Sequence, residues 1–175
     1  MLKIVNVPNT VLTTPVKSIV NFDPALLKLI SEMGKTLTAQ TDPPGVGLAA
    51  PQVNKNLALF IIKPTPKAKI EVFINPEIKK FEIKKFKTTK EKQKLEGCLS
   101  IPRIWGPVKR ANKVLLEYYN IKGKLKTEWF SGFKAVIIQH EVDHLNGILF
   151  TNRSLEQKAP IYEEEDGELR KVTLL

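Results

Sequence analysis

The chain has 175 residues, of which 42% are hydrophobic and 26% are charged, and it carries a formal net charge of +10. These proportions are ordinary for a soluble globular protein, and the length fits one domain with a sizeable core. The strongest apolar run, at residues 57–62, is far too short to span a bilayer, and the first residues lack the apolar stretch of a signal peptide. We therefore expect neither a membrane protein nor a disordered chain, but a soluble protein of the cytoplasm or an organelle matrix.

The single cysteine, Cys98, excludes an internal disulfide, which suits a reducing compartment and leaves a free thiol. Much of the positive charge is local, because residues 63–94 hold eleven lysines against four glutamates, or +7 of the net charge. Such a run is usually a solvated loop or an exposed hairpin, although it also attracts polyanions such as RNA. It lacks interleaved aromatic side chains that would stack on bases. We interpret it as a basic insertion at about residues 77–95.

In chain order, the first predicted element is a helix from residue 24 to about Gln40. Asp23 and Pro24 are typical of an N-cap and a first helical position. The apolar stripe at helical spacing consists of Leu26, Ile30, Met33 and Leu37. Residues 41–53 are rich in glycine and proline and predict a loop.

The middle of the chain predicts strands. Residues 57–62 and 70–75 are strand candidates, and residues 113–130 indicate a hairpin with its turn at Lys122 and Gly123. The next predicted element is a buried helix that starts at Ser131 as N-cap and stops at Gly147.

After that helix, residues 160–172 predict a short hairpin turning at Asp166 and Gly167, rather than another helix. Strands in the middle with helices around them predict an α+β fold. We expect residues 1–175 to form a single domain, with antiparallel strands packed around the helix that ends at Gly147.

That helix contains both histidines of the chain, His140 and His144, with Glu141 directly after the first. Four residues turn a helix by about 400°, so both imidazoles project from one face, one turn apart. Glu141 lies about 60° from His144 around the helix, close enough to act on whatever the imidazoles hold. Two structural histidines are the alternative interpretation, but the pattern H-E-x-x-H favours a metal site.

A catalytic site of this type generally has three protein ligands and one position for water. Two candidates compete for the third ligand. One is Cys98, whose thiolate is a strong ligand for zinc or ferrous iron and whose neighbour Gly97 leaves the backbone open to close approach. The other is a glutamate of residues 163–165, which lie 19 to 21 residues past His144, as in glutamate-ligated metallopeptidases. We favour Cys98.

Three motifs together resemble the signatures of the peptide deformylase family: GVGLAAPQ at 45–52, EGCLS at 96–100 and QHEVDH at 139–144. They occur in the family's order, and the resemblance covers most of the chain. It implies a metal-dependent hydrolase that removes the N-formyl group from the formylmethionine of nascent polypeptides and releases formate. It also implies one divalent metal ion, with Fe²⁺ expected in vivo and Zn²⁺ or Ni²⁺ in purified protein.

The resemblance implies a role for each motif residue. The metal ligands are Cys98, His140 and His144. The catalytic groups are Glu141, as general acid and base, and Gln52 with the backbone N–H of Leu99, as the oxyanion site. The residues that line the peptide and its methionine are Val46, Gly47, Gly97, Val136 and Ile137.

Two segments depart from the family pattern. Arg103 and Trp105 occupy a rim where many relatives carry an acidic or small residue and an arginine or tyrosine, so Trp105 is expected either to pack on the substrate or to be a surface aromatic. The lysine-rich segment is longer than in the family, and the tail lacks the long basic helix of some members. Beyond formylmethionyl peptides, the basic segment suggests electrostatic contact with the ribosome, and we expect no membrane or DNA partner. A basic RNA-associated module without enzymatic activity is the remaining alternative.

Overall fold

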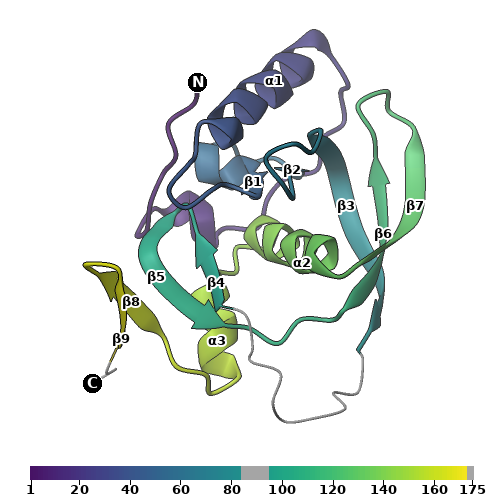
Figure 1. Ribbon diagram of the computed structural model, residues 1–175. Coiled ribbons are helices and arrows are strands. Elements are labelled where there is room, and N and C mark those ends of the chain that lie inside the picture. Colours follow the sequence, from purple (N-terminus) through teal and green to yellow (C-terminus); the bar gives the residue numbers. More distant parts are fainter. Residues whose placement is uncertain (84–94, 173–175) are drawn as a thin grey trace.

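The computed structural model describes residues 1–83 and 95–172 (Figure 1). The helices are α1 (Pro24–Thr38), α2 (Phe133–Leu145) and α3 (Phe150–Glu156), with 3-10 turns at Thr10–Thr13 and Ala50–Val53. The strands are β1 (Gly47–Ala49), β2 (Leu59–Ile62), β3 (Glu71–Glu82), β4 (Leu95–Cys98), β5 (Ile101–Pro107), β6 (Lys113–Tyr119), β7 (Leu125–Ser131), β8 (Tyr162–Glu165) and β9 (Glu168–Lys171). Much of the predicted basic insertion, residues 84–94, lies outside the described residues.

The strands form two antiparallel sheets. One has the order β1-β2-β3-β6-β7 and the other has the order β4-β5-β8-β9. Helix α2 lies between them (Figure 1). The expected fold, a single α+β domain with antiparallel strands around a central helix, is confirmed.

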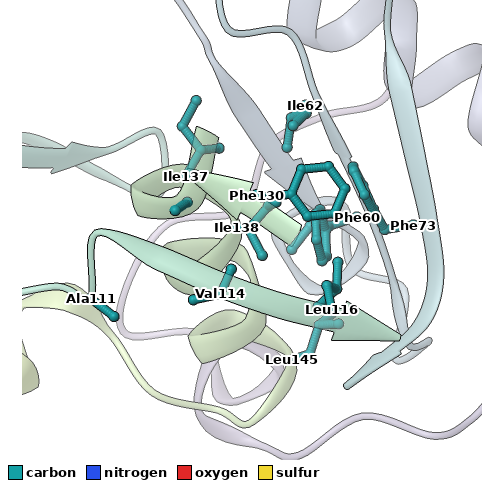
Figure 2. Packing of buried hydrophobic residues seen from close by; sticks show 12 residues of the cluster. Phe60, Ile62, Phe73, Ala111, Val114, Leu116, Phe130, Ile137, Ile138 and Leu145 are labelled. Carbon is teal, nitrogen blue, oxygen red and sulfur yellow. The ribbon is translucent and has the colours of Figure 1, made fainter. Parts of the chain in front are cut away.

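The buried side of α2 packs on the five-stranded sheet. Ile138 points into a cluster with Phe60 of β2, Phe73 of β3 and Phe130 of β7, and Ile137 belongs to the same cluster (Figure 2). Phe60 and Phe73 stack with their ring centroids 4.7 Å apart. Each side chain of this size contributes about 1.5–3 kcal/mol when it is fully buried. This cluster fixes the rotation of α2 and so determines which of its residues face the second sheet.

The predicted start of α1 is confirmed, because the Asp23 carboxylate accepts a hydrogen bond of 2.8 Å from the N–H of Leu26. The helix ends at Thr38, slightly before the predicted end at about Gln40. For α2 the predicted N-cap was wrong. Ser131 is the last residue of β7, and the cap is Gly132, at φ +62° and ψ −138°. Only glycine adopts this conformation easily, and it lets the chain turn directly from strand to helix.

The expected loop at residues 41–53 was wrong in part, because Gly47–Ala49 form the buried edge strand β1, paired with residues 60–62 of β2. Helix α3 was not predicted, and neither was β5. The hairpins at 113–130 and 160–172 are confirmed, and the turn of the second contains Asp166 and Gly167, both at positive φ.

Candidate active site

Helix α2 and strand β4 bring the chain's two histidines to its one cysteine. One ligand atom from each of Cys98, His140 and His144 lies within 4.8 Å of the others. The Sγ of Cys98 is 3.2 Å from Nε2 of His144, and the two imidazole centroids are 5.0 Å apart. The glutamates at 163–165 lie elsewhere, on β8, where the Glu164 carboxylate accepts a hydrogen bond from the indole N–H of Trp105. The structure therefore places the cysteine, rather than a glutamate, beside the histidine pair.

These three side chains fit a divalent metal ion. Nδ1 of His140 is engaged by Glu96, which leaves Nε2 as the ligand atom, and Nε2 of His144 faces the thiol. Burial would raise the pKa of Cys98, but the charge of His144 and the hydrogen bond with His140 lower it to about 5. The histidines thus favour the thiolate, which is the form of cysteine that binds a metal. Two nitrogens and one sulfur form a site that iron, zinc and nickel all accept.

A buried network of charged side chains fixes the orientation of His140. Glu96 on β4 accepts a hydrogen bond of 2.9 Å from Nδ1 of His140, and it binds Arg110 through two contacts of 2.8 and 2.9 Å. Burial would raise the pKa of Glu96, but the hydrogen bonds from Arg110 and His140 lower it to about 2. The carboxylate therefore stays charged and fixes the orientation of the imidazole.

The network continues through Asp143 on α2. This carboxylate binds Arg110 at 2.5 Å and Arg153 of α3 at 2.7 Å. The sequence singled out neither arginine, since nothing local marks a residue as a partner of a carboxylate that is distant in the sequence. From the sequence no role was assigned to Glu96 either, although its place in the motif EGCLS could have identified it as a site residue.

Glu141 lies beside the ligands, at the edge of β1. Its side chain is 3% exposed, and Oε2 has no hydrogen-bond partner within the described part of the chain. Burial raises the pKa of Glu141 to about 7, against the lowering effect of the two histidine charges. A Cβ at Gly47 would collide with the Glu141 carboxylate, so glycine at this position permits the close approach.

Gln52 is also buried, at the end of the 3-10 turn that follows β1. Its Oε1 accepts a hydrogen bond from the N–H of Ala49 at 2.9 Å, which turns its Nε2 toward Sγ of Cys98 and Oγ of Ser100, at 3.4 and 3.3 Å. The amide N–H groups therefore face the metal ligands. Ser100, which the sequence did not single out, belongs to the motif EGCLS and helps to orient this amide.

A cavity of about 820 Å³ opens in front of these groups. All the residues that the sequence proposed for peptide binding line it: Val46, Gly47, Gly97, Val136 and Ile137. Gln52, Leu99, His140 and Glu141 also line it, as does Trp105 at the rim. The cavity thus has an apolar side on α2 and polar groups at its floor, which is typical of a ligand site.

Comparison with known proteins agrees with this geometry. Residues 1–159 match the model of the family described as polypeptide deformylase. The chain belongs to this family. It is 40% identical over 154 residues to peptide deformylase 1 of Bacillus cereus, covering 87% of this chain and 92% of the relative. It is 35% identical over 177 residues to the peptide deformylase of Helicobacter pylori, covering 98% and 96% of the two chains.

Solved structures of deformylases share the fold. The crystal structure of the Thermotoga maritima peptide deformylase has a TM-score of 0.76 at 33% identity, covering 87% of this chain and 97% of that chain. The Synechococcus elongatus peptide deformylase, solved in complex with actinonin, has a TM-score of 0.76 at 33% identity, with coverages of 90% and 87%. The activity is therefore that of a peptide deformylase, a metal-dependent hydrolase that removes the formyl group from N-terminal formylmethionine. In the described residues no helix is long and apolar enough to cross a membrane.

Proposed function

We propose that Glu141 carries the proton in hydrolysis of the formyl group. When bound, the divalent ion supplies acidification of water and Lewis-acid polarisation of the formyl carbonyl. Glu141 accepts the proton of the attacking water and returns it to the departing amine, so that the products are formate and a free N-terminus. The observation that carries this role is a buried carboxylate beside Cys98, His140 and His144, with a pKa raised to about 7. A group with such a pKa exchanges a proton readily at neutral pH.

Gln52 and the backbone N–H of Leu99 form the oxyanion site in this proposal. Attack on the formyl carbon builds negative charge on its oxygen, and fixed donors in a site shielded from water stabilise that charge. The hydrogen bond from Ala49 to Oε1 of Gln52 supports this role, because it holds the donating side of the amide toward Cys98.

The substrate peptide lies extended between β1 and β4 in this proposal. Gly47 of β1 and Gly97 of β4 both line the cavity, and a side chain at either position would collide with Glu141 or Trp105, so both strands present bare backbone there. Val46, Val136 and Ile137 offer apolar surface for the methionine side chain. Sequence-independent backbone contacts, with one pocket for methionine, suit an enzyme that must accept many different nascent chains.

We further propose Fe²⁺ as the metal in vivo, with Zn²⁺ or Ni²⁺ as substitutes in purified protein, since the two imidazoles and one thiolate suit all three. The lone free cysteine supports a reducing compartment, the cytoplasm or an organelle matrix. Loading the protein with each ion under anaerobic conditions and measuring formate release per bound metal tests the assignment. Equal or higher turnover with zinc than with iron would contradict it.

The experiment that tests the catalytic assignment measures formate release from a formyl-Met peptide. Glu141→Gln keeps the shape of the side chain and removes its basicity, so kcat should fall by a factor of about 10²–10⁴ while the metal content is unchanged. A Glu163→Ala/Glu165→Ala double variant is the control for a glutamate ligand on β8 and should retain its metal. A Glu141→Gln protein with more than a tenth of wild-type activity would exclude Glu141 as the proton carrier.

We also propose that the basic segment at about 77–95 draws the enzyme to the ribosome, where its substrates emerge. Lys79 and Lys80 lie near the end of β3. Their positive charge would attract ribosomal RNA, because RNA is a polyanion. Neutralising the lysines of 79–94 should weaken cosedimentation with ribosomes and flatten its salt dependence. A matched variant neutralised at Lys122, Lys124 and Lys126 should cosediment like wild type. Equal ribosome association of all three proteins would overturn the proposal.

A further inference from the structure

A tryptophan covers the strand along which the proposed substrate lies. Side chains of a strand alternate between its faces, so Gly97 faces away from the side of β4 on which Glu96 reaches His140. Trp105 of β5 pairs directly with Gly97. A Cβ at Gly97 would lie only 2.7 Å from the six-membered ring of Trp105, so the indole rests directly on the glycine. Trp105 also lines the cavity, and its indole therefore forms an aromatic rim beside the peptide path.

The C-terminal hairpin holds this indole in place. The N–H of Trp105 donates a hydrogen bond of 2.8 Å to the carboxylate of Glu164 on β8. Tyr162 pairs with Trp105, so Glu164, two residues further along, presents its side chain on the same face of the sheet. The hairpin β8–β9 adds two strands to the sheet that contains β4 and β5. The match to the family model ends at residue 159, so Glu164 and the hairpin that carries it lie beyond the matched region.

The face on which the indole lies determines which side chain of the substrate it can contact. If the methionine side chain points inward to Val136 and Ile137 on α2, the side chain of the second residue points to the opposite face. That is the face on which Gly97 and the indole of Trp105 lie. We propose that Trp105, positioned by Glu164, contacts the second side chain and makes the enzyme prefer formylated peptides with an aromatic second residue. This inference rests on the proposed extended binding of the peptide.

The indole is suited to this contact. A flat aromatic surface held by a hydrogen bond at its edge offers its face to another ring, and such pairs favour association about 3- to 10-fold. Its conformation is already fixed, so little rotational freedom is lost when a side chain packs against it. Glu164 is a positioning residue here, because it acts on the substrate only through Trp105.

The test compares kcat/KM for formyl-Met-Phe-Ala and formyl-Met-Gly-Ala. In wild type the ratio of the two values should favour the phenylalanine peptide, and Trp105→Ala should lower this ratio about 3- to 10-fold. Glu164→Ala should lower the ratio in part, whereas Glu164→Gln, which keeps an acceptor oxygen, should preserve it. In a Trp105→Ala background, Glu164→Ala should have no further effect on the ratio. Trp129→Phe, at the other tryptophan of the chain, is the matched control and should leave the ratio as in wild type.

A binding measurement decides the matter even if Trp105→Ala fails to fold. In Trp129→Phe, all tryptophan fluorescence comes from Trp105, since the chain has two tryptophans. Saturation with the product Met-Phe-Ala should change this fluorescence more than saturation with Met-Gly-Ala. Equal changes with the two peptides, or an unaltered ratio in folded Trp105→Ala, would overturn the proposal. Absence of formate release from both peptides in wild type would instead overturn the proposed function.

Discussion

At the scale of single residues, the site depends on buried charges that compensate one another. Arg110 lies between Glu96 and Asp143, and all three side chains are less than 10% exposed. Taking charges out of water is costly, and the pairing offsets this cost only while every partner is present. Arg110 therefore acts on His140 indirectly, because it binds the carboxylate that orients this imidazole.

Removal of Arg110 should be strongly destabilising. Arg110→Met keeps much of the apolar volume but leaves Glu96 and Asp143 with one cationic partner fewer, so the free energy of unfolding should fall by about 3–5 kcal/mol. Urea unfolding followed by circular dichroism measures this difference. The matched control is Arg170→Met, which breaks an exposed pair with Glu165 and should cost about 0–1 kcal/mol. Similar losses in both variants would mean that burial of the network contributes nothing.

At the scale of the secondary structure elements, glycines fix where α2 begins and ends. Gly147 follows its last turn at φ +71°, and a Cβ there would lie 2.7–2.9 Å from backbone atoms of Thr13 and Thr14. The glycine thus serves two purposes, a left-handed backbone and the close packing of the N-terminal segment on the end of the helix. This packing helps to hold the helix that carries both histidines.

The two contributions can be separated by experiment. Gly123 has nearly the same φ, +69°, but a Cβ there would meet only the ring of Phe22 at ordinary contact distances. Gly123→Ala should therefore lower the free energy of unfolding only by the cost of placing alanine in a left-handed backbone conformation, about 1–2 kcal/mol. Gly147→Ala should cost more, because the backbone of residues 13–14 must also move. Equal losses in denaturant titrations of the two variants would show that this segment adapts freely.

The same elements show what the sequence can and cannot predict. Asp23, Gly147 and Gly167 act within a few residues of the chain, so the start of α1, the end of α2 and the last hairpin were all predicted. Strand β1 was missed because Gly47–Ala49 have little strand propensity, and only pairing with β2 in the core makes them a strand. Strand β5 was missed for a similar reason, since it contains two prolines and a glycine.

For the site too, the sequence identified some of the residues and missed others. Apart from His144, the residues named from the motifs line one cavity, because each motif combines several of them in a short segment. Arg110 and Arg153 were missed because their partners are distant in sequence, and ordinary arginines look the same in a sequence whether they are buried or exposed. Tertiary contacts decide such roles, and a single sequence does not record them.

At the scale of the whole molecule, the three ligands join two halves of the fold. Cys98 belongs to the sheet β4-β5-β8-β9, whereas both histidines lie on the helix that packs against the five-stranded sheet. An ion held by these side chains therefore links the two sheets through α2. An ion that binds the native state but not the unfolded chain stabilises the fold according to its concentration relative to Kd.

Chelation should accordingly lower the thermal stability of the wild-type protein. At a free metal concentration of about 100 times Kd, the ion contributes about 2.7 kcal/mol, and its removal should lower Tm by roughly 5–10 °C for a chain of this length. Scanning calorimetry with and without excess chelator measures the shift. His144→Ala removes one ligand, so its Tm should be lower from the start and should respond little to chelator, because little metal remains to be removed. If the variant lost as many degrees as wild type, the stabilising ion would have to bind somewhere other than between β4 and α2.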